Sequence, residues 1–204
     1  MARASKQHLA AVGVAEHGNS AELVTVGPGP QVLDRRRIDL TCGLPTHPYH
    51  HEGSWAVGRY LNSAWARPIA LSDAVALVER VHKAAEQGAR QVLEELSAAL
   101  PAPVSRIAIR VCPQLPPTIR ECIADTRAAN VADSVMYRQS LARAATARGW
   151  LVHWYDRERV FADAAATIGQ HSIDAVLAAM GRAAGPPWQA RHKLAAAAAV
   201  AALA

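Results

Sequence analysis

Residues 10–40 read "AAVGVAEHGNSAELVTVGPGPQVLDRRRIDL", and this stretch decides the fold. Two apolar segments, 8–15 and 21–26, flank the polar turn residues of 17–20. "GPGP" at 27–30 marks a second turn, because glycine and proline are the strongest chain breakers. The segment 31–40 then alternates between two faces, as a strand does. The stretch therefore predicts three strands joined by short turns, which form an antiparallel meander.

Helices and strands alternate after the meander. Apolar residues recur at helical spacing through most of 72–100, and "PAP" at 101–103 ends that helix. "VSRIAIRV" at 104–111 and "WLVHWYD" at 150–156 read as strands, with helical patterns between and after them. The order β-β-β-α-β-α-β-α-α predicts an α/β protein with a mixed five-stranded sheet and helices on both faces. We expect a single domain over 1–204, with a histidine-rich loop insertion at about 41–67.

The charge of the chain is basic and comes mainly from arginine. The net charge is +5 at pH 7, with 19 arginines and 3 lysines. Arginine suits phosphate because its planar fork binds two oxygens at once, so nucleic acid is a possible partner. Compositional bias of a GC-rich genome is the alternative explanation. Three cysteines without CxxC spacing suggest neither a disulfide framework nor a zinc ribbon.

Nothing in the sequence predicts a membrane segment. The N-terminal stretch is a poor signal peptide, because acidic and polar residues interrupt its short apolar part. The longest apolar run, 194–204, has about half the length that a membrane span needs and is mostly alanine. We expect a cytoplasmic protein with no membrane partner.

Three stretches carry a resemblance to a known fold: the meander of 10–40, "SRIAIRV" at 105–111, and the stretch from "WLVHWYDRERV" to the alanine-rich end. Their order and spacing resemble the ribonuclease H-like superfamily, and more closely its RuvC-type resolvase branch. The resemblance implies an enzyme that cuts nucleic acid phosphodiesters with two metal ions. Carboxylates from the first strand, the end of the fourth strand and the closing helix would hold the metals, because Mg²⁺ prefers oxygen ligands.

The chain departs from that pattern at each expected position. Ala15 stands where the first-strand aspartate belongs, and Glu16 next to it points to the opposite face of a strand. The fourth strand ends in "RVCPQ" without an acid. The closing helix has Ala190 and Lys193 near the position of the expected aspartate, and a lysine there would repel Mg²⁺. Glu16 and Asp156, at the carboxyl end of the last predicted strand, remain as candidate catalytic acids.

"THPYHHE" at 46–52 is the densest group of ligand-type side chains. His47, His50, His51 and Glu52 predict a divalent metal site, with Mg, Mn or Zn as possible ions. A polar site without metal, in which histidine acts as a hydrogen-bond donor or a base, is a second interpretation. In a third, prolines shape the loop and the histidines bond to backbone groups.

Basic side chains elsewhere are candidates for contacts with nucleic acid. Arg35 and Arg37 share one face of a predicted strand and suit phosphates, although charges on an edge strand also discourage strand addition. Arg138 lies near a predicted helix start, and Lys193 lies on the closing helix. We list all four as candidate nucleic-acid-binding residues.

Three further residues are candidates for a polar site. His17 and Asn19, in the first turn, are expected near the same edge of the sheet as Asp156. Asp133 belongs to a helix that is predicted to begin at Asn130 or Asp133. There it is either part of a binding constellation or an N-cap or first-turn acid that the helix dipole favours.

Three functions remain open from the sequence. The first is a catalytically degenerate ribonuclease H-like domain that binds nucleic acid or a protein partner. The alternative is a divergent metal-dependent nuclease or phosphodiesterase that uses the "THPYHHE" loop. The third is a homo-oligomeric scaffold, since the C-terminal helix "KLAAAAAVAALA" has small side chains that permit close approach of another helix.

Overall fold

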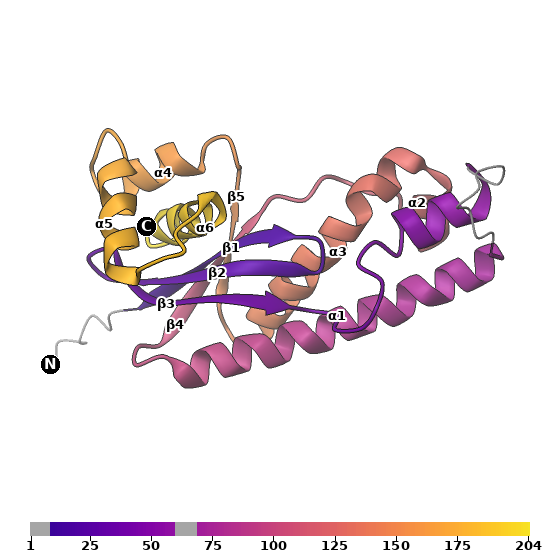
Figure 1. Cartoon of the computed structure of the whole chain (residues 1–204), viewed down its shortest axis with the longest axis horizontal. Coiled ribbons are helices and arrows are strands. Elements are labelled where there is room, and N and C mark those ends of the chain that lie inside the picture. Colours follow the sequence, from indigo (N-terminus) through magenta and orange to yellow (C-terminus); the bar gives the residue numbers. More distant parts are fainter. Residues whose placement is uncertain (1–8, 60–68) are drawn as a thin grey trace, which may run out of the picture.

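The computed structural model describes residues 9–59 and 69–204, and a five-stranded sheet forms its centre (Figure 1). The strands are β1 (Ala10–His17), β2 (Ser20–Gly27), β3 (Gln31–Asp39), β4 (Val104–Arg110) and β5 (Leu151–Tyr155). Their order across the sheet is β3-β2-β1-β4-β5. The first three strands pair antiparallel, whereas β1, β4 and β5 run parallel. The predicted meander and mixed sheet are confirmed.

Helices cover both faces of this sheet, as predicted. They are η1 (His50–Arg59, a π-helix), α1 (Leu71–Ala99), α2 (Ile119–Ala124), α3 (Thr126–Ala147), α4 (Val160–Thr167), α5 (Asp174–Ala184) and α6 (Ala190–Ala201). One core lies between the sheet and α1 and α3, and a second lies between the sheet and α4, α5 and α6. Among the described residues, no helix combines the length and apolar character that crossing a membrane requires.

The central strand β1 is buried on both faces. Val12 and Val14 pack toward α1 and α3, and Ala11 and Ala15 pack toward α6. A Cβ on Gly13 would lie 1.8 Å from the carbonyl oxygen of Ala195, so α6 touches the backbone of the strand. Such close approach requires small side chains on the helix, which explains its run of alanines.

The same packing removes the reason for predicting an oligomer through the alanine-rich helix. Residues 195–201 are buried against β1, β2 and α4 of the same chain. The small side chains that suggested packing against a second copy are already packed against elements of the same chain.

Two local predictions were wrong. α3 begins at Thr126, because the carboxylate of Asp125 accepts hydrogen bonds from the backbone amides of Arg127 and Ala128 and caps the helix there. Asp133 therefore lies inside the helix, not at its start. Part of the segment predicted as a loop, His50–Arg59, is helical, and residues 60–67 lie outside the described residues.

Candidate functional site

The three parallel strands end at the same edge of the sheet, which we call the carboxyl rim. A pocket of about 150 Å³ lies at this rim, between the strand ends and α6. We call it the rim pocket, and it is lined by Ala15, Glu16, His17, Arg110, Arg157, Arg191 and Leu194. The carboxyl rim is where ligands commonly bind in sheets with parallel strands.

Glu16 in this pocket is bound by a buried arginine from α3. Nε of Arg138 donates a hydrogen bond to Oε1 of Glu16 at 2.8 Å, and a second nitrogen of the guanidinium contacts the same oxygen. Arg138 also donates to the carbonyl oxygen of Val111 at 2.9 Å. The side chains of Glu16 and Arg138 are only 8 % and 6 % exposed. The negative charge of Glu16 is therefore balanced inside the protein.

The other charged side chains of the rim pocket are arginines. Nη1 of Arg110 lies 4.0 Å from Oε1 of Glu16. The side chains of Arg157 and Arg191 are exposed, and neither has an ion-pair or hydrogen-bond partner in residues 9–59 and 69–204. Because Arg138 already balances Glu16, three guanidinium groups leave the pocket positive. Its chemistry suits an anion.

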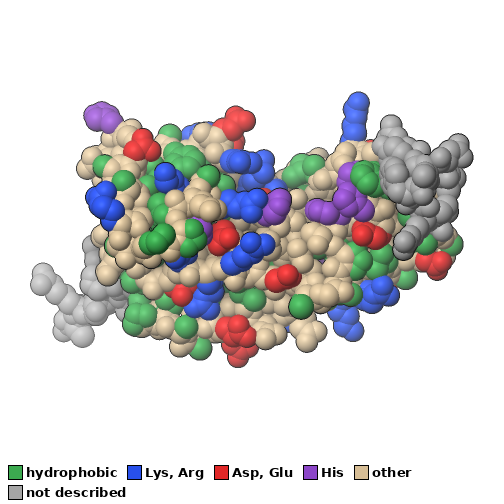
Figure 2. Space-filling model, viewed as in Figure 1, with side chains coloured by type: hydrophobic (Ala, Val, Ile, Leu, Met, Phe, Trp, Pro, Cys, Tyr) green, Lys and Arg blue, Asp and Glu red, His purple; other side chains and the backbone are tan. Residues whose placement is uncertain are grey.

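Figure 2 places this charge in a wider surface. Lys and Arg side chains gather beside α6, and His side chains gather near η1 on the same face, on either side of a depression. His17 lines the rim pocket, and the next residue, Gly18, lies against the other group: a Cβ on Gly18 would lie 2.7 Å from Cγ2 of Thr46 and 3.6 Å from Cε1 of His47. The carboxyl rim is thus continuous with the "THPYHHE" segment, residues 46–52.

The turn after β5 places Arg157 at the rim. Oδ1 of Asp156 accepts a hydrogen bond from the backbone amide of Glu158 at 2.8 Å, and its carbonyl oxygen accepts from Arg159 and Val160. These bonds close the turn that leads into α4. Asp156, a candidate catalytic acid, is therefore a turn residue that does not line the rim pocket beside Glu16.

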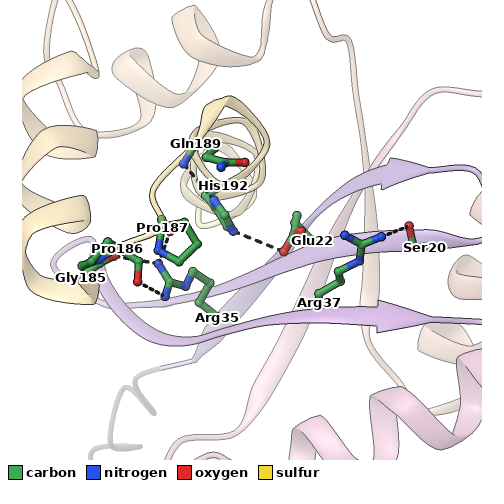
Figure 3. Close-up of polar contacts among 9 residues, drawn as sticks. All are labelled: Ser20, Glu22, Arg35, Arg37, Gly185, Pro186, Pro187, Gln189 and His192. Carbon is green, nitrogen blue, oxygen red and sulfur yellow. Dashed lines mark hydrogen bonds and ion pairs between the residues drawn. The ribbon is translucent and has the colours of Figure 1, made fainter.

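The first turn of α6 places Arg191. Nδ1 of His192 accepts a hydrogen bond from the backbone amide of Gln189 at 3.0 Å, and its Nε2 lies 3.3 Å from Oε2 of Glu22 (Figure 3). His192 is buried and its ring stacks on Trp188. With His192 held on β2, Arg191 points to the rim pocket.

The predicted nucleic-acid-binding residues differ in their positions. Arg35 donates to the carbonyl oxygens of Gly185, Pro186 and Pro187, so it holds the connection between α5 and α6 (Figure 3). Arg37 is exposed and donates to Oγ of Ser20 at 3.4 Å. Lys193 is exposed but does not line the rim pocket, whereas Arg191 in the same turn of α6 does. Arg138 is buried on Glu16.

The "THPYHHE" segment is fixed to α3 and to the turn between β1 and β2. The hydroxyl of Tyr137 donates to the carbonyl oxygen of Thr46 at 2.9 Å, and the backbone amide of Tyr49 donates to Oδ1 of Asp133 at 2.9 Å. The side chain of Asn19 accepts from the hydroxyl of Thr46 at 3.4 Å and donates to Asp39 at 2.9 Å. The segment therefore lies close to the carboxyl rim.

The histidine rings of the segment pack on one another. Ring centroids are 5.0 Å apart for His47 and His51 and for His50 and His51, and His51 lies 4.3 Å from Trp55. Oε2 of Glu52 is buried without a hydrogen-bond partner, and burial raises the pKa of this carboxyl. In the described part of the chain, no three His, Cys, Asp or Glu side chains are placed to hold a metal ion. The metal ligands stay a prediction.

Asp133 lies beneath this segment and is 3 % exposed. Its Oδ2 has no hydrogen-bond partner and lies 3.7 Å from Nδ1 of His47. Burial raises the pKa of Asp133 to about 7. Burial, followed by the nearby His51 and His17, lowers the pKa of His47. The carboxyl of Asp133 therefore changes charge near neutral pH, whereas the neutral form of the His47 imidazole is favoured.

The sequence analysis missed Arg110, Arg157 and Arg191. A signal was present, because each follows or ends a predicted strand or opens the closing helix, where parallel strands bring residues together. The resemblance predicts acids near these positions, so the bases there were not among the predicted site residues.

No family model matches the chain, and no curated protein matches it. Among solved structures, the chain is similar to T. thermophilus RuvC in complex with Holliday junction substrate. The identity is 12 %, the TM-score is 0.49, and the match covers 95 % of this chain and 92 % of that chain. A second structure, Thermus thermophilus RuvC, has 16 % identity and a TM-score of 0.45 over the same shares. Both carry the name of the branch that the sequence resembles.

Proposed function

We propose that the protein is a RuvC-like domain that binds the phosphate backbone of nucleic acid at its carboxyl rim and has lost two-metal cleavage. The observation that carries the proposal is the rim pocket. Three arginines line it beside one carboxylate, Glu16, that Arg138 already pairs; of these three described residues, only Arg110 approaches this carboxylate, at 4.0 Å. The chain's own topology and charge supply the rest of the support.

The loss of cleavage follows from the charge at the rim. Divalent magnesium needs anionic oxygen ligands. Glu16 is the acid among the described residues that line the rim pocket, and its carboxylate already forms an ion pair with Arg138. The positive charges of Arg110, Arg157 and Arg191 would repel a divalent cation. A site of this composition attracts the phosphate but not the metal ions.

Binding through phosphates requires exposed basic groups that can neutralise the phosphates and so release the counterions condensed on the nucleic acid. Arg157 and Arg191 meet this condition, since both are exposed and unpaired in the described chain. Guanidinium groups bind phosphate oxygens in pairs. The net charge of +5 adds a long-range attraction to any polyanion.

The affinity for duplex and branched DNA at two salt concentrations tests this function. Between about 50 and 200 mM salt we expect a marked loss of affinity, with a log–log slope that becomes shallower by about 1 for each phosphate contact removed. Arg157→Ala and Arg191→Ala should each reduce the slope. Arg90→Ala, on the exposed side of α1 across the sheet, is the charge-matched control. Absence of binding, or equal behaviour of the pocket and control variants, would refute the proposal.

A second candidate function is hydrolysis of phosphodiesters by the "THPYHHE" segment. The observation in its favour is the buried carboxylate of Asp133 beside the half-exposed ring of His47, an arrangement that orients an imidazole as a base. Elemental analysis of untagged protein and a phosphodiesterase screen with Mn²⁺ test it. A bound metal, or an activity that His47→Ala and His51→Ala abolish, would assign this function. A metal-free, inert protein would exclude it.

A further inference from the structure

We propose that the rim pocket binds the terminal phosphate monoester of a nucleic-acid strand, whose negative charge the guanidinium groups of Arg110, Arg157 and Arg191 neutralise. This inference rests on the proposed function, since it names the group that the rim recognises. It goes further, because an internal backbone phosphate and a strand end differ in charge, shape and number of free oxygens.

The size of the pocket limits what can enter. Pockets that enclose a whole small molecule have volumes of about 300–1,000 Å³. The rim pocket, at about 150 Å³, has room for a phosphate group and a few water molecules, but not for a nucleoside. Ala15 and Leu194 form its apolar wall, where α6 packs on the end of β1. The sugar and base would stay outside, along the surface toward His17.

The charge of the pocket matches a doubly charged ion. A terminal phosphate carries about two negative charges at neutral pH, whereas a phosphodiester carries one. Glu16 contributes no net charge, because Arg138 is bonded to it from the side of α3. The three remaining guanidinium groups are better neutralised by a dianion than by a monoanion.

The supply of hydrogen-bond donors points the same way. Each guanidinium presents five N–H donors and no acceptor. A terminal phosphate has three non-bridging oxygens that accept them, and a diester has two. Arg157 and Arg191 have no other partner in the described chain, so their donors are available without breaking an existing contact. Arg110 is 4.0 Å from Glu16, so it also retains free donors.

The test compares oligonucleotides of one sequence that differ only at their ends: 5′-phosphate, 3′-phosphate, or hydroxyl at both. Binding is measured in EDTA at fixed ionic strength. One of the phosphorylated strands should bind about tenfold or more tightly than the hydroxyl strand, the ratio that one charge-assisted hydrogen bond supplies. The end that is preferred identifies the source of the phosphate. Inorganic phosphate should compete away the preference.

Variants connect the preference to the pocket. Arg157→Ala and Arg191→Ala should remove the preference for a phosphorylated end, so that the ratio of the affinities for the phosphorylated and hydroxyl strands falls to about one. The affinity for every strand should also fall, because the same arginines contribute to backbone binding. Both residues are exposed, so the substitutions should not disturb folding. Arg191→Lys keeps the charge but loses the fork, and should retain only part of the preference. Arg90→Ala should retain all of it.

The outcomes separate this inference from the proposed function. Equal affinity for all three strands, with a normal salt slope, overturns the terminal-phosphate site and leaves backbone binding intact. A preference that survives in Arg157→Ala and Arg191→Ala also overturns it, because the phosphate would then bind elsewhere. Failure of every strand to bind overturns both proposals together.

Discussion

A one-residue difference at the end of β1 decides what its carboxylate can do. At position 15 a side chain faces α6, and at position 16 it faces α3. Glu16 therefore meets Arg138 and forms a buried ion pair instead of an open ligand. A buried pair is costly to break, because the remaining charge has no water and no partner.

Arg138→Ala is expected to lower the free energy of unfolding by about 3–5 kcal/mol, since it leaves Glu16 buried and unpaired. The double variant Glu16→Gln, Arg138→Met should recover most of this loss, because it removes both charges. Urea denaturation of the two variants and the wild type measures the difference. A single variant as stable as wild type would show that Glu16 gains solvent or another partner.

Asp133 makes stability depend on pH. Its pKa is raised from 3.8 to about 7 in the folded protein, so folding favours the protonated form. The corresponding stability is fully present below about pH 4 and is lost as pH rises through about 7. Asp133→Asn keeps an acceptor for the amide of Tyr49 but carries no charge.

Wild type should therefore lose stability relative to Asp133→Asn between pH 5 and pH 8, as thermal unfolding at the two values measures. Asp73→Asn, at an exposed position in α1, serves as the control and should follow wild type. A constant difference between wild type and Asp133→Asn across this range would contradict the raised pKa.

At the scale of elements, the position of α6 depends on contacts outside the helix. Arg35 on β3 holds the three carbonyl groups that precede it, and Glu22 on β2 holds His192 in its first turn. These contacts orient the end of the helix that carries Arg191 (Figure 3). The strand charges that suggested a phosphate-binding surface thus partly serve to anchor a helix.

Arg35→Ala should destabilise the protein by about 1.5–3 kcal/mol, the contribution of hydrogen bonds to a charged group. Arg37→Ala, two residues away on the same face and exposed, should change stability by less than about 0.5 kcal/mol. Chemical denaturation of the pair measures the contrast. Equal effects of the two substitutions would mean that the carbonyl contacts of Arg35 contribute little.

At the scale of the whole molecule, the sequence predicted the sheet better than the site. Alternation and turn residues over 10–40 indicate the meander because they depend on neighbours in the chain. The rim pocket instead assembles residues from four distant places, Glu16, Arg110, Arg157 and Arg191. The parallel order of β1, β4 and β5 brings the first three together, and the packing of α6 on the sheet adds Arg191.

The misplaced start of α3 has a similar cause. Asn130, Asp133 and Asp125 are all residues that cap helices well, and the sequence alone does not rank them. Asp133 is buried under the "THPYHHE" segment by a tertiary contact, the hydrogen bond that the backbone amide of Tyr49 donates to its carboxylate. The local sequence pattern therefore could not predict that Asp133 titrates near neutral pH. It could have predicted the arginines at the strand ends.

The contact between Gly13 and α6 also bears on synthesis. The strand at the centre of the sheet, Ala10–His17, leaves the ribosome well before the helix that covers one of its faces, Ala190–Ala201. Until then Ala11, Val24 and Val26 have no cover on that side. We expect the partly synthesised sheet to be prone to aggregation through this exposed apolar face until the helix packs on it.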